Sequence, residues 1–223
     1  MRKQAKKRCG AWFSFCLFIV RVFTKRKKVQ GEPMDEPCVY LCRHRDQSGV
    51  IDAFTNINKV MRPWVLHIFT DYNLAKKHLK EYTFSQKDKR GKLFSAIVAP
   101  IAAFGMTSLV KSGKGIPVYR NNEGMRSIIT IKNSVKAIEN GENILIFPDV
   151  DYAAKDGGEN REIYQGFALI DKLYFKRNQK HIPFVPVYMD KKRLVYHAPV
   201  YMQGNEEEFF ERIVNGIYSA DEK

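Results

Sequence analysis

Acidic residues are absent from the first 30 positions of this 223-residue chain, although these positions hold ten of its 38 lysines and arginines. This stretch accounts for most of the formal net charge of +14, because the remaining residues carry 28 basic and 24 acidic side chains. A groove for nucleic acid requires excess positive charge over the folded body, together with a readout motif or a stacking platform. The sequence has neither, so we expect no nucleic-acid partner.

Cysteine is also scarce, with four residues that all fall among the first 42: Cys9, Cys16, Cys38 and Cys42. Their spacing matches neither a metal site nor a disulfide framework, and nothing near the other histidines suggests metal ligands. We therefore expect free thiols in a reducing compartment, no metal and no bound cofactor.

Internal repeats and low-complexity tracts are missing as well, and the 44% share of hydrophobic residues argues against a disordered chain. The length suffices for one domain with a full hydrophobic core. We predict a membrane-associating segment over residues 1–30 and a single folded domain over residues 31–223.

The N-terminal segment contains an apolar stretch, residues 11–23, between the basic flanks 2–8 and 25–28. As a helix, this stretch measures about 20 Å, which is short of the roughly 30 Å of a bilayer's hydrocarbon core. We expect it to lie at the membrane surface with its basic flanks on anionic lipid. The protein would then occupy the cytoplasmic face of a membrane, peripheral or N-terminally anchored.

Two alternatives stay open for this segment. A cleaved signal peptide would require a small-x-small cleavage site, but the apolar stretch passes directly into the basic residues 25–28. A short spanning anchor is the other alternative.

Strand-like and helix-like patterns alternate along the rest of the chain. Residues 38–42, 143–147, 182–188 and 194–200 are apolar runs typical of strands. Helical patterns resume at Asp52, start again at Ser127 and after Gly166, and end the chain with an amphipathic helix. Strands that alternate with helices indicate an α/β fold.

Residues 93–110 contain no charged side chain. The stretch is long enough for a membrane-spanning helix, but Pro100 and Gly105 interrupt it. We expect a buried or membrane-apposed helix pair there.

Polar residues follow three of the predicted strands, at residues 44–52, 115–120 and 148–149. In α/β proteins, ligands bind beyond the carboxyl ends of the strands. We therefore expect these three loops to converge on one cleft.

Several segments occur in the order typical of the glycerolphosphate and lysophosphatidate acyltransferase family, and the chain resembles that family over about residues 38–200. Gly115-Ile116-Pro117-Val118-Tyr119-Arg120 is similar to the end of the family's second block. Phe147-Pro148-Asp149 resembles the start of its Phe-Pro-Glu-Gly-Thr-Arg block, Gln165-Gly166-Phe167 the Lys-Gly that follows, and Val185-Pro186-Val187 its last block. The resemblance implies a single-domain α/β fold with a mixed, mostly parallel sheet flanked by helices.

The family's first block is Asn-His-x4-Asp, in which the histidine takes a proton from the acceptor hydroxyl and the aspartate orients it. Here His44 precedes Asp52 by eight residues. If Asp52 is the family's aspartate, Gln47 occupies the histidine position. If His44 is the base, Asp46 or a looped-back Asp52 orients it. We predict His44 as the base, against the alternative of a surface histidine.

The third block also departs from the family, since Asp149-Val150-Asp151-Tyr152 stands in place of Glu-Gly-Thr-Arg. The lost arginine is an expected phosphate ligand, which leaves Arg120 as the principal anion ligand and Arg43 or Arg45 as substitutes. Asp149 and Asp151 are further candidates for holding the acceptor. An exposed strand-end arginine at Arg120 and a turn cap at Asp149 are the structural alternatives.

The resemblance implies a membrane-peripheral acyltransferase. It would move a fatty acyl group from acyl-CoA or acyl carrier protein to a hydroxyl of glycerol phosphate or a lysophospholipid-type acceptor, a reaction that requires no cofactor. The alternative is a catalytically inactive lipid-binding or scaffold protein of the same fold, whose altered blocks mark lost activity.

Overall fold

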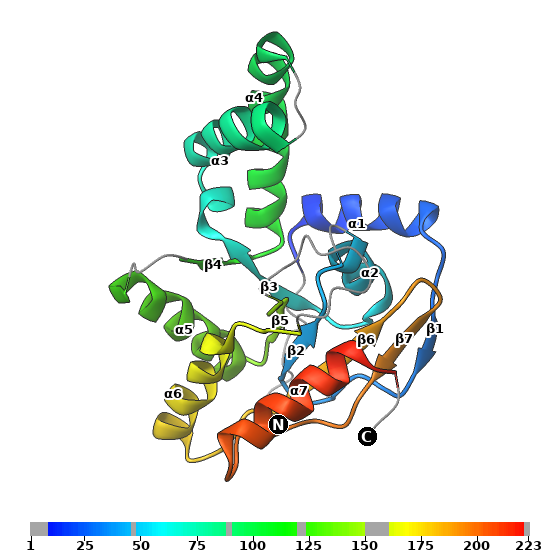
Figure 1. Ribbon diagram of the computed structural model, residues 1–223, viewed down its shortest axis with the longest axis vertical. Coiled ribbons are helices and arrows are strands. Elements are labelled where there is room, and N and C mark those ends of the chain that lie inside the picture. The colour runs from blue at the N-terminus through cyan, green and yellow to red at the C-terminus, as the bar shows by residue number, and fades with distance from the viewer. Residues whose placement is uncertain (1–8, 46–47, 88–90, 120–123, 150–160, 221–223) are drawn as a thin grey trace. The chain divides into compact units, whose positions relative to one another are not determined.

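The computed structural model describes residues 9–45, 48–87, 91–119, 124–149 and 161–220 (Figure 1). The chain divides into two compact units. Most of the first unit is formed by Leu17–Arg62 and Ile131–Lys223, and the second by Arg8–Cys16 and Pro63–Thr130. The boundary predicted at residue 30 stays a prediction.

Seven strands in the described part of the chain follow the hydrogen-bonded order β1-β7-β6-β2-β5-β3-β4. Their bounds are β1 Lys28–Gln30, β2 Val39–Cys42, β3 Met61–Leu66, β4 Ile116–Val118, β5 Asn143–Ile146, β6 Phe184–Met189 and β7 Arg193–Tyr196. The pairs β1–β7, β2–β5, β2–β6 and β3–β4 are parallel, whereas β6 and β7 are antiparallel. The expected α/β fold with a mixed, mostly parallel sheet is confirmed.

Strand β2 lies at the centre of the first unit, between β5 and β6. All four of its residues are buried, and Tyr40 is in register with Leu145 on one side and Val185 on the other. A continuous apolar strand is expected where both faces of a parallel sheet are covered. The loop that follows β2 therefore starts from a rigid and central position.

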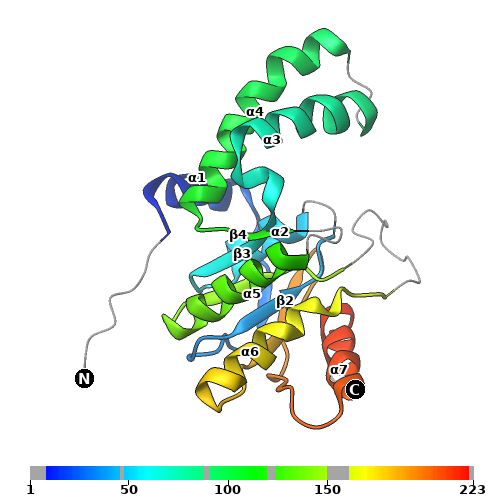
Figure 2. The same ribbon diagram turned by 90° about the vertical axis from the view of Figure 1, so that its left-hand side faces the viewer.

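Helices cover the sheet of the first unit, namely α2 Ser48–Asn56, α6 Leu169–Asn178, α7 Glu206–Tyr218 and the C-terminal part of α5 Gly124–Glu139. Figure 2 shows the C-terminal part of α5 beside α6. An ion pair joins the two helices, with Arg177 Nε 3.4 Å from Glu139 Oε1. The predicted amphipathic helix at the C-terminus is α7, whose phenylalanines and isoleucines pack on β6. Asn205 caps it by accepting the Glu207 N–H, and its first turn is acidic, as the helix dipole favours.

Helix α2 begins at Ser48, one turn earlier than the helical pattern at Asp52 indicated. Gly49 lies so close to the preceding loop that a β-carbon there would collide with the carbonyl oxygens of Arg43 and His44. The Gly49 N–H donates to the His44 carbonyl at 3.0 Å. Glycine therefore allows the helix to start directly against the loop, which the apolar periodicity alone did not reveal.

The second unit contains η1 His67–Thr70, α3 Tyr72–His78, η2 Leu79–Lys87 and α4 Lys92–Ser112. The expected helix pair over residues 93–110 is wrong, because α4 is one continuous helix with Pro100 inside it. Proline removes one backbone hydrogen bond from a helix. Packing against α3 offsets this loss, since Ala99 and Ala103 form a buried cluster with Ala75 and Leu79.

The start of α1 Ala11–Phe23 is attached to the C-terminal end of α4 within the second unit. The Gly10 N–H donates to the Ser112 carbonyl at 2.7 Å, and the Phe13 N–H donates to the Ser112 hydroxyl at 2.9 Å. These bonds satisfy backbone groups at a helix terminus, which would otherwise require solvent.

Candidate active site

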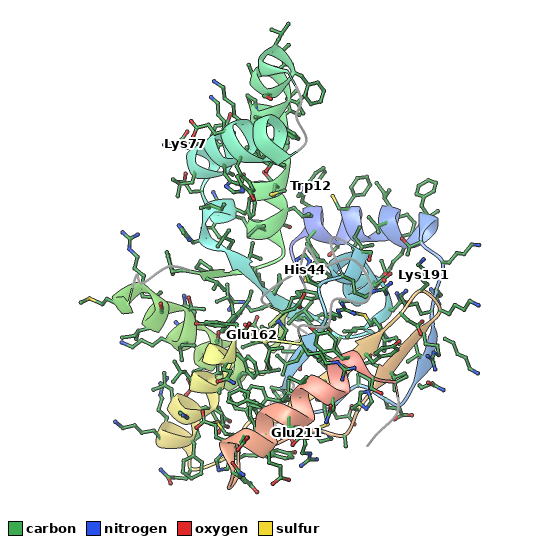
Figure 3. All side chains as sticks on the ribbon, viewed as in Figure 1. Trp12, His44, Lys77, Glu162, Lys191 and Glu211 are labelled. Carbon is green, nitrogen blue, oxygen red and sulfur yellow. The ribbon has the colours of Figure 1, made fainter. Side chains whose placement is uncertain are left out.

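The loop of Arg43, His44 and Arg45 leaves the C-terminal end of β2 (Figure 3). Arg45 has a φ of 45°, in the left-handed region that lets the chain turn sharply from strand to helix. The Ser48 hydroxyl donates to the Arg45 carbonyl at 2.9 Å. The loop is thus held from both ends, by a buried strand and by the first turn of α2.

Asp149 follows β5, the neighbour of β2, and its carboxylate holds this loop. The backbone N–H of His44 donates to the two oxygens of Asp149 at 2.9 and 3.0 Å. Burial raises the pKa of Asp149, and the His44 N–H works against that rise. The predicted convergence of the loops after β2 and β5 therefore occurs through a buried acid and a backbone amide.

The ring of His44 also lies on the β5 side. It packs edge-on against Phe147, with ring centroids 5.4 Å apart. Phe147 precedes Asp149 by two residues, so one short segment after β5 contacts both the side chain and the backbone of His44.

Asp52 points to different partners. Its Oδ2 is 3.0 Å from Lys27 Nζ and 3.8 Å from an Arg45 guanidinium nitrogen. The side chains of Lys27 and Asp52 are 5% and 13% exposed, so the pair is shielded from solvent, and removal of either partner would leave a charge uncompensated. The described ion pairs of Asp52 thus tie the residue before β1 and the β2 loop to α2, and its predicted orienting role stays a prediction.

The two arginines beside His44 extend toward β6 and α7. An Arg45 guanidinium nitrogen donates to the Met189 carbonyl at 3.2 Å, and the Arg43 guanidinium lies 4.8 Å from the centroid of the Tyr218 ring. Arg161 approaches the same ring at 5.8 Å. The loop therefore separates its side chains, with histidine toward β5 and arginines toward β6.

A pocket of about 380 Å³ opens between these arginines and the turn from β6 to β7. Its lining includes four basic and two tyrosine side chains, those of Arg43, Arg45, Lys191, Lys192, Tyr188 and Tyr218. Figure 3 shows Lys191 at the tip of this turn. No local pattern in the sequence points to these lysines and tyrosines, because they lie more than 140 residues beyond the loop they face.

Asp190 is the acidic side chain of this pocket, and its charge is engaged within its own turn. Its Oδ1 accepts the backbone N–H groups of Lys192 and Arg193, each at 2.7 Å, and its Oδ2 accepts the Arg193 Nε–H at 3.0 Å. Burial acts to raise the pKa of Asp190, but these donors prevail and lower it to about 2. The carboxylate stays ionised while its oxygens point into the turn.

Two buried thiols lie along the central strand, Cys42 at the end where the His44 loop begins and Cys38 just before the strand's start, but neither supplies a nucleophile. Burial raises the pKa of Cys38 to about 12 and also raises the pKa of Cys42. Only the thiolate reacts as a nucleophile, so neither cysteine is suited to form an acyl-enzyme.

A second histidine–aspartate pair lies at the opposite end of β6. His181 Nδ1 is 2.7 Å from Asp171 Oδ2, and the Ile182 N–H donates to Asp171 Oδ1 at 2.7 Å. Since this pair precedes the strand, it lies away from the carboxyl ends where α/β sites form. It fastens α6 to the start of β6.

Three predicted site residues, Asp46, Arg120 and Asp151, lie outside the described residues. The predicted third loop, residues 115–120, begins in the second unit. The described part of the site therefore consists of His44, Asp149 and the arginines Arg43 and Arg45, with Asp52 in its own ion pair.

No protein-family model matches the chain, and no curated protein matches it in sequence. Its structure is similar to the crystal structure of the 1-acyl-sn-glycerophosphate (LPA) acyltransferase PlsC from Thermotoga maritima, with a TM-score of 0.51 and 11% sequence identity. The similarity covers 92% of this chain and 79% of that chain. The chain has the fold of the PlsC acyltransferase. This finding confirms the fold that the sequence resemblance implied.

Proposed function

We propose that this protein is a membrane-peripheral acyltransferase that moves a fatty acyl group from a thioester donor to a lipid-type hydroxyl. One observation carries the proposal: a histidine loop leaves the central strand of a PlsC-like sheet and is fastened by the acid that follows the next strand. A base must be held in a fixed position to take a proton in the transition state. The Asp149 carboxylate supplies that positioning for the loop.

In the proposed reaction, the His44 imidazole takes the proton of the acceptor hydroxyl as its oxygen attacks the thioester carbonyl carbon. A carbon–oxygen bond forms, the carbon–sulfur bond breaks, and the imidazolium returns its proton to the departing thiolate. Asp46 or Asp52 orients the imidazole. Asp52 would have to share its carboxylate with Lys27, because that pair is formed in the structure.

The donor would be acyl-CoA or acyl carrier protein, and the acceptor a glycerol phosphate or a lysophospholipid. Arg120, Arg43 and Arg45 are the proposed ligands of the acceptor's anionic group. Asp149 acts through the His44 loop, and Asp151 retains its predicted role in holding the acceptor.

We place the protein on the cytoplasmic face of a membrane. Large apolar side chains of α1 are exposed, among them Phe15, Phe18, Val22 and Phe23. Basic residues follow the helix at residues 25–28. This combination supports binding to a bilayer that contains anionic lipid.

The test is acyl transfer from labelled acyl-CoA and acyl carrier protein to glycerol phosphate, lysophosphatidate and other lysolipids in liposomes. His44→Ala should lower turnover by at least about 100-fold, since a general base contributes on that order or more. His78→Ala is a matched control, because the His78 ring contacts Phe69 and Tyr82 and none of the proposed site residues. Equal activity of His44→Ala and the parent protein would exclude His44 as the base.

The second candidate function is an inactive lipid-binding or scaffold protein. The engagement of Asp52 by Lys27 and Arg45 favours it, because an orienting acid would have to face His44 instead. Absence of transfer to every acceptor, together with intact liposome binding by the parent protein, would select this function over catalysis.

A further inference from the structure

The pocket between the arginines of the β2 loop and the β6–β7 turn is strongly basic. Arg43, Arg45, Lys191 and Lys192 line it, and the carboxylate of Asp190 is already bonded to Lys192 and Arg193. Asp52, the acid nearest Arg45, is paired with Lys27 at 3.0 Å. Four cations thus line the pocket together with one acid, Asp190, and the lining retains an excess of positive charge.

We propose that this pocket binds a phosphate group of a substrate, which rests on the proposed acyltransferase function. Phosphate oxygens accept the in-plane donors of arginine in pairs and also attract the ammonium groups of lysine. The central carbon of the Arg43 guanidinium lies over the Tyr218 ring, 4.8 Å from its centroid, and the guanidinium carries five N–H donors. The contact with Tyr218 therefore holds Arg43 at the pocket without consuming all of its donors.

The four cations of the pocket differ in their contacts and exposure. Arg45 is bonded to the Met189 carbonyl and approaches Asp52, so it forms a fixed wall of the pocket. Lys191 and Lys192 are exposed on the turn and add two positive charges to the lining. A volume of about 380 Å³ with this polar lining fits a headgroup rather than a long acyl chain.

The position of the pocket connects it with His44. Arg43 and Arg45 are the immediate neighbours of His44, so their α-carbons lie about 3.8 Å from its own. The phosphate would sit on the β6 side of β2, whereas Asp149 and Phe147 hold His44 on the β5 side. In this arrangement, basic residues of the β2 loop and the β6–β7 turn would bind the phosphate in place of the arginine that the third sequence block lacks.

Binding of three probes to the full-length protein tests the proposal. Inorganic phosphate represents the shared chemistry, glycerol 3-phosphate the acceptor, and adenosine 3′,5′-bisphosphate the nucleotide end of an acyl-CoA donor. Isothermal titration of the parent protein is compared with Arg43→Gln/Lys191→Gln and, to protect against misfolding, with the turn variant Lys191→Gln/Lys192→Gln. The control Lys136→Gln/Lys176→Gln removes two exposed charges from α5 and α6.

We expect the parent protein to bind phosphate, and both pocket variants to bind it at least about tenfold more weakly, since each removes two charged donors. The control should bind like the parent protein. A loss confined to glycerol 3-phosphate assigns the pocket to the acceptor, and a loss confined to the bisphosphate assigns it to the donor. Unchanged affinity in both pocket variants, or no binding of any probe by the parent protein, overturns the proposal.

The binding measurement separates this proposal from the proposed catalysis. If the parent protein transfers no acyl group but its phosphate binding falls in the pocket variants, the pocket stands and the catalytic function fails. If the parent protein transfers acyl groups and the variants bind phosphate normally, the catalytic function stands and the pocket proposal fails. In an active enzyme, Lys191→Gln/Lys192→Gln should raise KM for a phosphate-bearing substrate more than it lowers kcat.

Discussion

Helices α4 and α7 are both rich in large apolar side chains, but they direct them oppositely. Helix α7 buries Phe209, Phe210, Ile213 and Ile217. In α4, the buried positions include the small residues Ala99 and Ala103, whereas several of its large side chains face outward. Leu93, Ile97, Ile101 and Phe104 are 76%, 59%, 70% and 68% exposed. Their spacing of four, four and three residues places them on one face of the helix.

The difference indicates two different surroundings. An outward Leu, Ile or Phe in water forgoes about 1.5–3 kcal/mol of burial free energy, so the outward row on α4 is costly in water and the buried row on α7 is not. Helix α4 spans 21 residues, about 31 Å at 1.5 Å per residue. By length and composition, one helix in the described residues could cross a membrane, and it lies within α4. The outward face of α4 therefore adds support to the proposed membrane association.

The largest effect expected from this comparison concerns folding stability. Phe209→Ala should lower the free energy of unfolding by about 3–5 kcal/mol, because it removes a buried ring that contacts Phe167 and Phe184. Phe104→Ala on α4 should change it by less than about 0.5 kcal/mol in detergent-free solution. Urea unfolding of both variants measures these changes. Equal losses of unfolding free energy would show that Phe104 is as well packed as Phe209.

A smaller effect is expected on membrane binding. Ile97→Glu/Ile101→Glu should weaken sedimentation with liposomes of phosphatidylcholine and phosphatidylglycerol by at least about tenfold, because each charge opposes entry into the apolar layer. The matched control is Ile128→Glu/Ile129→Glu, which alters two partly exposed isoleucines of α5. Thermal unfolding should be unchanged in both variants.

Two outcomes would contradict a lipid-facing α4. If Ile97→Glu/Ile101→Glu binds liposomes as well as the parent protein does and Phe18→Glu does not bind them, the membrane contact belongs to α1 alone. A change of oligomeric state in Ile97→Glu/Ile101→Glu, without a change in liposome binding, would identify the α4 face as a contact between copies of the chain.

The smallest expected effects are changes in stability when one glycine of each helix is replaced by alanine. A β-carbon at Gly216 of α7 would lie 2.6 Å from Pro186 Cβ on β6, whereas a β-carbon at Gly105 of α4 meets nothing within 4 Å. Gly216→Ala should therefore destabilise the protein by about 1–3 kcal/mol through overpacking. Gly105→Ala should stabilise it by about 0.5–1 kcal/mol through helix propensity. Denaturant midpoints with unchanged slopes would measure both, and destabilisation by Gly105→Ala would show that α4 is covered.

Much of the fold could be predicted because its signals are local. The apolar runs at β2, β5 and β6 and the one-sided pattern of α7 each reveal an element within a few residues. The pattern of α4 was misleading because Pro100 usually ends a helix, and only the packing of α3 on Ala99 and Ala103 explains why it does not.

The site was predicted in part for the same reason. Polar residues at the ends of neighbouring strands pointed to His44 and Asp149, but their bond uses the His44 backbone, which side-chain motifs do not describe. The pairing of Asp52 with Lys27 joins residues that share no motif.

Local sequence patterns were sufficient for the α/β class, the central apolar strands and the loops that carry His44 and Asp149, because propensity and hydrophobic period act over neighbouring residues. Which side chains meet depends on tertiary packing. In the folded chain, Asp52 pairs with Lys27, Arg43 contacts Tyr218, and Lys191 and Lys192 line the same pocket as the loop after β2. Those contacts depend on the order of strands in the sheet, and strand order is set by the packing of the whole chain rather than by any local pattern.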